Sequence, residues 1–139
     1  GVDGSDVSRR ATEVAFEEAA ARGAELHAVH TWVDTQIQGP GAGYAVSEDH
    51  WQAVQAEKDE LLSSYLDELS EQYPEVVVKK TITRDRPVRA LAEAAQGAQL
   101  LVTGSHGRGG FKGMLLGSTS RALLQEAPCP MMVVRTQDS

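Results

Sequence analysis

The densest group of residues suited to binding chemistry lies near the carboxyl end of the chain, at residues 103–120. Three of its glycines and a serine have the spacing Gly104-x2-Gly107-x9-Gly117-Ser118. Glycine lets consecutive backbone N–H groups turn into a concave nest for an anion, because no Cβ stands in the way. The Gly-Ser-Thr triplet at the end of the stretch is predicted to start a helix, where free N–H groups attract negative charge. The stretch therefore predicts a site that holds phosphate groups from two sides.

Side chains around these glycines add donors and positive charge. The hydroxyls of Ser118 and Ser120 are further donors, and Arg108 or Lys112 supplies a cation. A glycine-rich loop can also be a plain connector, but this one follows the apolar segment 100–102 and precedes a Ser-capped helix, which favours the binding role. The chain has no Gly-Lys pair and no Gly-x-Gly-x-x-Gly pattern, which excludes a P-loop NTPase and a standard dinucleotide-binding unit.

Segments with helical and strand patterns alternate along the chain. Short runs of apolar or β-branched residues predict strands at residues 25–32, 76–83, 100–102 and Met131–Val134. Apolar spacing and capping residues predict helices at Asp6–Arg22, 47–73, 87–97 and Ser118–Glu126. This alternation is typical of an α/β fold, in which helices cover both faces of a parallel sheet. Ligands of such sheets bind at the carboxyl ends of the strands. Four loops are predicted to begin there, at Asp3, Thr31, Thr83 and Thr103.

Composition narrows the class of protein. A chain of 139 residues is long enough for one domain with a full core. Its net charge of −7 disfavours bulk attraction to a nucleic-acid backbone or an anionic membrane. No apolar run approaches the roughly 18 residues of a membrane span, and the single cysteine excludes an internal disulfide framework and fits a reducing compartment. We therefore expect one domain over residues 1–139 that works in the cytoplasm and has neither nucleic acid nor membrane as a partner.

The spacing of Gly104, Gly107, Gly117 and Ser118 resembles the ATP-binding signature of the universal stress protein family. The resemblance extends to residues 2–5, 23–26 and 127–134. It implies an open, mainly parallel five-stranded sheet with helices on both faces, a Rossmann-like fold similar to that of the adenine nucleotide alpha hydrolases. The first strand would be truncated in this chain, so residues upstream of Gly1 are expected. The chain also resembles one half of the tandem stress proteins of actinobacteria.

The same resemblance implies a role for each matching residue. Asp3 is expected near the ribose and adenine, although an Asp there also suits a turn. Thr31 is expected to present its backbone to the adenine edge. The residues expected around the phosphates are Gly104, Gly107, Arg108, Gly117, Ser118 and Thr119. The implied ligand is ATP, or AMP or ADP, together with Mg²⁺, and no catalytic residue or protein metal ligand is predicted.

Three functions remain open at this point. The first is a regulator in the stress response that changes conformation or partners with the bound adenine nucleotide, and the glycine spacing favours it. The second is an enzyme that uses the same loop, either a slow ATPase or a nucleotidyl or phosphoryl transferase. The third is a dimeric interaction module of the same fold that binds no nucleotide. The resemblance implies that residues 131–134 pair with their own copy across a two-fold axis, and an edge strand with unpaired backbone groups suits such pairing. A homodimer is therefore expected, or a pseudo-dimer with an upstream domain.

Overall fold

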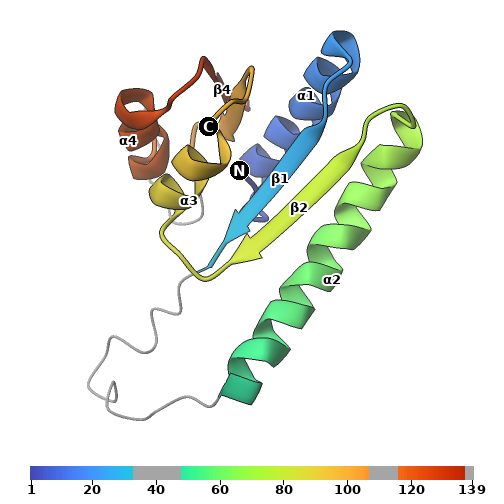
Figure 1. The fold of residues 1–139 in the computed structure, drawn as a ribbon, viewed down its shortest axis with the longest axis vertical. Coiled ribbons are helices and arrows are strands. Elements are labelled where there is room, and N and C mark those ends of the chain that lie inside the picture. Colours follow the sequence, from blue (N-terminus) through green and yellow to red (C-terminus); the bar gives the residue numbers. More distant parts are fainter. Residues whose placement is uncertain (33–47, 107–115, 137–139) are drawn as a thin grey trace.

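The computed structural model describes residues 1–32, 48–106 and 116–136, and helices alternate with strands throughout these ranges (Figure 1). In chain order the elements are α1 (Asp6–Arg22), β1 (Leu26–Thr31), α2 (Glu48–Gln72), β2 (Val78–Thr83), α3 (Pro87–Ala94), β3 (Leu101–Gly104), α4 (Ser118–Glu126) and β4 (Met131–Val134). The predicted α/β class is confirmed, with small shifts at the ends of several elements. The predicted loop at 33–46 lies outside the described residues. The candidate residues Gly107, Arg108 and Lys112 also lie outside them.

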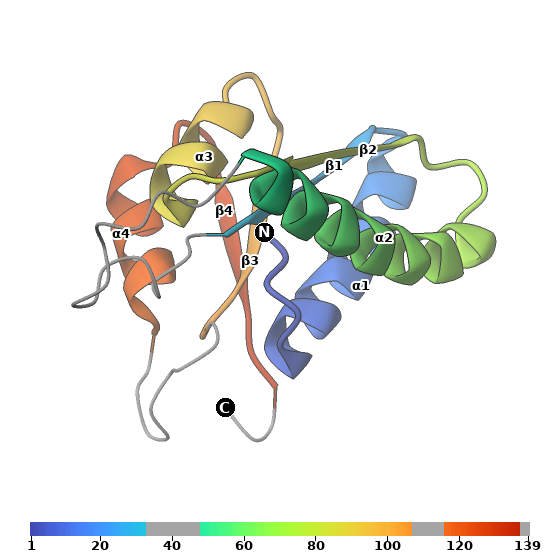
Figure 2. The ribbon, with the colours of Figure 1, turned by 90° about the horizontal axis from the view of Figure 1, so that it is seen from below.

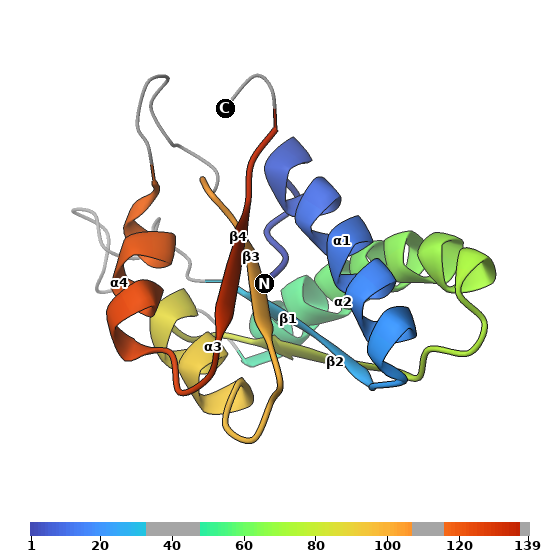
Figure 3. The same cartoon turned by 90° about the horizontal axis from the view of Figure 1, so that it is seen from above.

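The strands form two parallel pairs. β1 pairs with β2 so that Leu26 lies opposite Val78, and β3 pairs with β4 so that Leu101 lies opposite Met131. Figure 3 shows the β3–β4 pair running at an angle to the β1–β2 pair. Where one five-stranded sheet was expected, the described residues thus contain four strands in two separate ladders.

The first residues of the chain lie between these two ladders. The nitrogen of Gly1 donates to the carbonyl oxygen of Val102 at 3.1 Å, and the amide of Val2 donates to the carbonyl oxygen of Val29 at 2.9 Å. Figure 2 shows the amino terminus at this position, beside both β1 and β3. The short extended segment at Gly1 and Val2 therefore connects β1 to β3, although it is not itself assigned as a strand.

Side chains of β1 point alternately to two cores, one on each face. Ala28 packs with Phe16 of α1 and with Leu62 and Leu66 of α2. Its neighbour Val29 packs with residues of α3, β3 and α4 on the opposite face. The two-residue period of the strand thus buries Ala28 on one face and Val29 on the other, whereas His27 is exposed.

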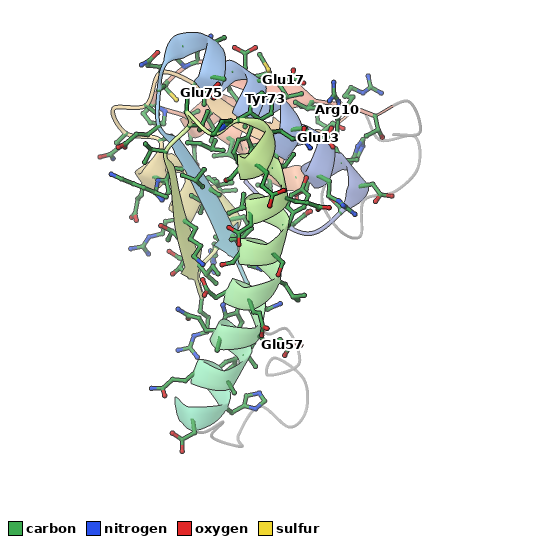
Figure 4. All side chains as sticks on the ribbon, turned by 90° about the vertical axis from the view of Figure 1, so that its right-hand side faces the viewer. Arg10, Glu13, Glu17, Glu57, Tyr73 and Glu75 are labelled. Atoms are coloured by element: carbon green, nitrogen blue, oxygen red, sulfur yellow. The ribbon has the colours of Figure 1, made fainter. Side chains whose placement is uncertain are left out.

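Capping residues fix both ends of α1, and its outer side carries ion pairs. The hydroxyl of Ser5 accepts from the amide of Ser8, and Gly23 ends the helix with a φ of 62°, a left-handed conformation that favours glycine. Figure 4 labels Arg10, Glu13 and Glu17 on this helix. The guanidinium of Arg10 lies 3.0 Å from the carboxylate of Glu13 and 3.9 Å from that of Glu17.

None of the helices within the described ranges combines the length and apolarity that crossing a bilayer requires.

Candidate functional site

The two ends of the glycine-rich stretch meet at the carboxyl end of β3. The amide of Ser105 donates to the carbonyl oxygen of Val134 on β4 at 2.8 Å, which continues the β3–β4 ladder by one residue. The amide of Gly117 donates to the carbonyl oxygen of Ser105 at 2.6 Å. The backbone therefore brings the amino end of α4 beside the last residues of β3. Sequence spacing predicted that the two ends of this stretch share one ligand, and this geometry places them side by side.

The hydroxyl residues in the first turn of α4 differ in their surroundings. Ser118 is exposed and Thr119 is half-buried, whereas Ser120 is buried. Ser120 donates its hydroxyl hydrogen to the carbonyl oxygen of Gly104 at 2.6 Å. Its hydroxyl thus holds α4 against β3, while Ser118 and Thr119 stand with Gly117 at the amino end of the helix, where negative charge is stabilised.

Gly104 is a glycine for a reason that the binding motif did not predict. A Cβ added to it would lie 2.7 Å from Cγ1 of Val7, in the first turn of α1. Real Cβ atoms do not approach other carbons so closely, so a side chain here would push α1 away from β3. This glycine serves the packing of α1 on β3 in addition to any contact with a ligand.

Asp3 forms the turn that leads into α1. Its Oδ1 accepts from the amide of Ser5 at 2.8 Å and from the Ser5 hydroxyl at 2.6 Å. The amide of Asp3 donates to the hydroxyl of Ser8 at 3.0 Å, and the intervening Gly4 has a φ of 85°. The turn-forming role that the sequence left open for Asp3 is therefore present in the structure. Asp3 directly follows Val2, whose amide is hydrogen-bonded to Val29 of β1. The carboxylate of Asp3 therefore lies at the same edge of the sheet as Gly104.

Thr31 is the last residue of β1, opposite Thr83 at the end of β2. The next amide, that of Trp32, donates to the carbonyl oxygen of Thr83 at 3.0 Å and extends the ladder. The Trp32 ring lies 5.2 Å from the ring of Trp51, in the first turns of α2. Arg84 places its guanidinium 4.4 Å from the centre of the Trp51 ring, a cation–π contact.

This cluster of Trp32, Trp51 and Arg84 was not predicted as part of the site. The sequence does contain a signal for it, because Trp32 directly follows Thr31 and Arg84 directly follows Thr83. The indole Nε1 of Trp32 and the hydroxyl of Thr103 are both buried and have no hydrogen-bond partner among the described residues. Both belong to residues at or next to the carboxyl ends of their strands, β1 and β3.

The described part of the site offers backbone donors and hydroxyls rather than a set of metal ligands. Within residues 1–32, 48–106 and 116–136 there is no group of three or more His, Cys, Asp or Glu side chains suited to hold a metal ion. Donors at a helix start suit an anionic group such as a phosphate.

Comparison with known sequences identifies relatives over almost the whole chain. Residues 1–135 match the universal stress protein family. Universal stress protein Rv2005c of Mycobacterium tuberculosis is 47% identical over 136 residues, which cover 97% of this chain and 44% of that protein. Universal stress protein Rv1996 of the same organism is 45% identical over 97% of this chain and 42% of its own length. The chain thus spans less than half the length of these relatives.

Solved structures share the fold. The universal stress protein UspA from Lactobacillus plantarum superposes with a TM-score of 0.77 at 21% identity, over 96% of this chain and 93% of its own. A universal stress protein from Archaeoglobus fulgidus in complex with dAMP has a TM-score of 0.63 at 22% identity, over 96% and 92% of the two chains. A universal stress protein in complex with cAMP has a TM-score of 0.63 at 24% identity, over 97% and 92%. These likenesses confirm the Rossmann-like α/β fold, and the sequence match over residues 1–135 shows that the chain belongs to the universal stress protein family.

Proposed function

We propose that the chain binds an adenine nucleotide at the carboxyl ends of β1 and β3, with the phosphates against the amino end of α4. The observation that carries this proposal is the hydrogen bond from Gly117 to Ser105, which joins the two ends of the glycine motif. The N–H groups of the first turn of α4 then face the same volume as the end of β3. Two family members solved with cAMP and with dAMP support an adenine nucleotide as the ligand class.

The preferred ligand within this class is ATP with Mg²⁺, and AMP and ADP are the alternatives. Phosphate-binding groups on two sides, the glycine motif and the start of α4, suit a chain of several phosphates better than a single one. Mg²⁺ keeps several waters and binds chiefly through phosphate oxygens, so it does not require a dedicated cluster of protein carboxylates. The protein would then respond to the bound nucleotide as a regulator of the stress response in the cytoplasm.

Calorimetric titration of the chain with Mg-ATP, AMP and cAMP tests this site. Ser118→Ala removes an exposed hydroxyl at the start of α4, and we expect it to weaken ATP binding several-fold because a hydrogen bond contributes about 1 kcal/mol. Gly117→Val places a branched side chain where the phosphates approach and is expected to abolish binding. Ser64→Ala, at an exposed position on α2, is the matched control. Unchanged ATP affinity in a folded Gly117→Val protein would refute the site.

Fast hydrolysis of the nucleotide is not part of this proposal. Phosphoryl transfer needs a placed nucleophile and charge stabilisation on the transferred group, and the described residues hold no carboxylate or histidine cluster for the purpose. We expect turnover far below the value of about 10 s⁻¹ common among enzymes. Release of phosphate near that rate, abolished by Gly117→Val, would make the chain an ATPase instead.

We also propose that β4 mediates association with a second copy or with a related domain. In the described ladders β4 is bonded to β3 on one side and is the terminal strand of its pair. Met131, Met132 and Val133 are half-buried apolar residues on this strand. Val133→Lys should shift a dimer toward monomer in sedimentation velocity, and Val77→Lys, at an exposed apolar residue next to β2, should not. A wild-type chain that is monomeric at tens of micromolar would exclude a homodimer through this edge.

A further inference from the structure

The peptide group between Val2 and Asp3 lies close to the ends of both β1 and β3. The amide of Val2 donates to the carbonyl oxygen of Val29 on β1 at 2.9 Å. One residue earlier, the nitrogen of Gly1 donates to the carbonyl oxygen of Val102 on β3 at 3.1 Å. Asp3 itself is half-buried. The proposed nucleotide site spans the carboxyl ends of the same two strands, so the orientation of this peptide group affects the shape of that site.

Hydrogen bonds hold this peptide group at both of its polar atoms. The carbonyl oxygen of Val2 accepts from Nδ1 of His30 on β1 at 2.6 Å. The N–H of Asp3 donates to the hydroxyl of Ser8, a buried residue of α1, at 3.0 Å. Because the atoms of a peptide group lie close to one plane, holding the oxygen on one side and the nitrogen on the other fixes the rotation of the whole group. The direction in which the chain continues to Asp3 is thereby fixed as well.

The bond from His30 takes the place of a backbone bond. Since the amide of Val2 donates to Val29, a continued parallel ladder would have the amide of Thr31 donate to the carbonyl oxygen of Val2. Among the described residues that oxygen instead accepts from the imidazole, and from no backbone amide. The β1–β2 ladder uses backbone groups alone, so a substitution at His30 changes the contact with Val2 and leaves that ladder in place.

The contact also determines which ring nitrogen of His30 carries the hydrogen. A carbonyl oxygen has no hydrogen to donate, so Nδ1 must be the donor to Val2. Neutral imidazole has one hydrogen on its two ring nitrogens, and the hydrogen bond made by one nitrogen sets the state of the other. The neutral ring of His30 therefore has its hydrogen on Nδ1 and an acceptor at Nε2.

Further hydrogen bonds carry this constraint to the carboxylate of Asp3. Its Oδ1 accepts from the amide of Ser5 at 2.8 Å and from the Ser5 hydroxyl at 2.6 Å. The Ser5 hydroxyl in turn accepts from the amide of Ser8 at 3.2 Å, and the Ser8 hydroxyl accepts from the amide of Asp3. The backbone and the carboxylate of Asp3 therefore belong to one closed ring of bonds, and His30 attaches this ring to β1.

We propose that His30 is a positioning residue of the nucleotide site. Its imidazole orients the peptide group between Val2 and Asp3, and through it the carboxylate of Asp3, at the carboxyl ends of β1 and β3. The inference rests on the proposed function, because it assigns His30 a role in binding the same nucleotide. His30 acts through the backbone rather than by contact with the ligand. A backbone held in its binding orientation in advance increases affinity, because less conformational freedom is lost when the ligand binds.

Two substitutions separate the Nδ1 donor from the rest of the ring. Asn and Leu both branch at Cγ and both lack the ring, but only Asn has an N–H at the position of Nδ1. In calorimetric titration we expect His30→Leu to weaken ATP binding about fivefold or more and His30→Asn to weaken it by less than about twofold, because one hydrogen bond separates the two. His27→Leu, on the same strand, is the matched control. The His27 ring contacts the side chain of Thr81, so this change should leave ATP affinity unaltered.

NMR spectroscopy tests the orientation of the peptide group without any ligand. Nitrogen–hydrogen correlation spectra should show the hydrogen of the neutral His30 ring on Nδ1. In His30→Leu the amide of Asp3 should exchange about tenfold faster, because the peptide group opens locally. The amide of Leu26, which bonds Val77 in the β1–β2 segment, should keep its exchange rate. A hydrogen on Nε2, or equal acceleration of both amides, would overturn the proposal.

The titrations distinguish failure of this inference from failure of the proposed function. If the wild type binds ATP and His30→Leu binds it equally well, His30 has no positioning role and the nucleotide site stands. A lower Tm of His30→Leu with unchanged ATP affinity would likewise assign the bond to stability alone. Equal weakening in His30→Leu and His30→Asn would trace the effect to the lost ring and contradict a role for the Nδ1 bond. A wild-type chain that binds no adenine nucleotide would overturn both the site and the role of His30.

Discussion

The hydroxyl of Ser120 donates to the carbonyl oxygen of Gly104 at 2.6 Å, so the first turn of α4 is held directly against the end of β3. Both residues belong to the glycine-rich stretch, yet this contact is internal to the protein. The hydroxyl therefore contributes to the shape of the site even before any ligand is bound.

Ser120→Ala should consequently reduce stability as well as nucleotide affinity. It leaves the half-buried carbonyl of Gly104 without this donor, and we expect a loss of about 1–2 kcal/mol in the free energy of unfolding. Urea unfolding measures this change, and Ser118→Ala, at the exposed hydroxyl of the same turn, should change stability by less than about 0.5 kcal/mol. Equal losses in the two variants would show that the Ser120 contact does not stabilise the fold.

Gly104→Ala should destabilise the protein through α1 rather than through the ligand. Its Cβ would stand 2.7 Å from Cγ1 of Val7, and relieving such an overlap costs about 1–3 kcal/mol. Val7→Ala removes the opposing methyl groups, so the double variant should be less unstable than the sum of the two single variants. Additive losses in a double-mutant cycle would show that the two sites do not interact.

Stability should rise with pH between 7 and 8 in a chain whose first residue is Gly1. The pKa of its amine is about 6 in the folded state and 8.0 as its ordinary value, so the unfolded chain binds the additional proton in this range. We expect a gain of about 1 kcal/mol in the free energy of unfolding across this interval, since each pKa unit corresponds to about 1.4 kcal/mol. Amino-terminal acetylation should abolish the slope, and an acetylated chain with an unchanged slope would assign it to another group.

The interval starts at pH 7 because of His27. Burial first, and then the charges of Lys79 and the amino terminus, lower the pKa of this imidazole below 6.5. Protonation of His27 in the unfolded chain therefore reduces stability mainly at and below pH 6.5. Measurements above pH 7 separate the amine from this second contribution.

Trp32→Phe should be far better tolerated than Trp32→Ala. The Trp32 side chain is buried against Trp51, but its Nε1–H has no partner among the described residues. Phe retains most of the apolar contact and removes the unpaired donor, so we expect a loss below about 1 kcal/mol. Ala leaves a cavity, for which about 3–5 kcal/mol is typical. If urea unfolding shows that Trp32→Phe and Trp32→Ala lose the same free energy of unfolding, the indole nitrogen makes a stabilising hydrogen bond.

Local patterns in the sequence predicted most of the fold. The stop at Gly23 and the helix start at Ser118 both act within one turn of the chain, so neighbouring residues predict them. The pairing of strands could not be predicted in the same way, because it depends on contacts between distant segments. The bonds of Gly1 to Val102 and of Val2 to Val29 are of this kind.

The candidate site was predictable where its residues form a motif and not where packing determines their role. Gly117 and Ser118 lie at the start of α4, as their spacing indicated. Gly104 and Ser120 turned out to make internal contacts with Val7 and with each other, and no local pattern encodes either contact. The cluster of Trp32, Trp51 and Arg84 was not predicted, because it depends on where α2 packs relative to the ends of β1 and β2.

Ser105 gives the molecule a means of coupling its two proposed activities. This fully buried residue donates its amide to Val134 on β4 and accepts, at its carbonyl, the amide of Gly117 at the start of α4. A shift of Gly117 toward a bound phosphate would therefore be transmitted to β4 through the backbone of one residue. If nucleotide changes the affinity between copies by some factor, association must change the affinity for nucleotide by the same factor. The protein would then report nucleotide concentration as a change in its state of assembly, without any chemical reaction.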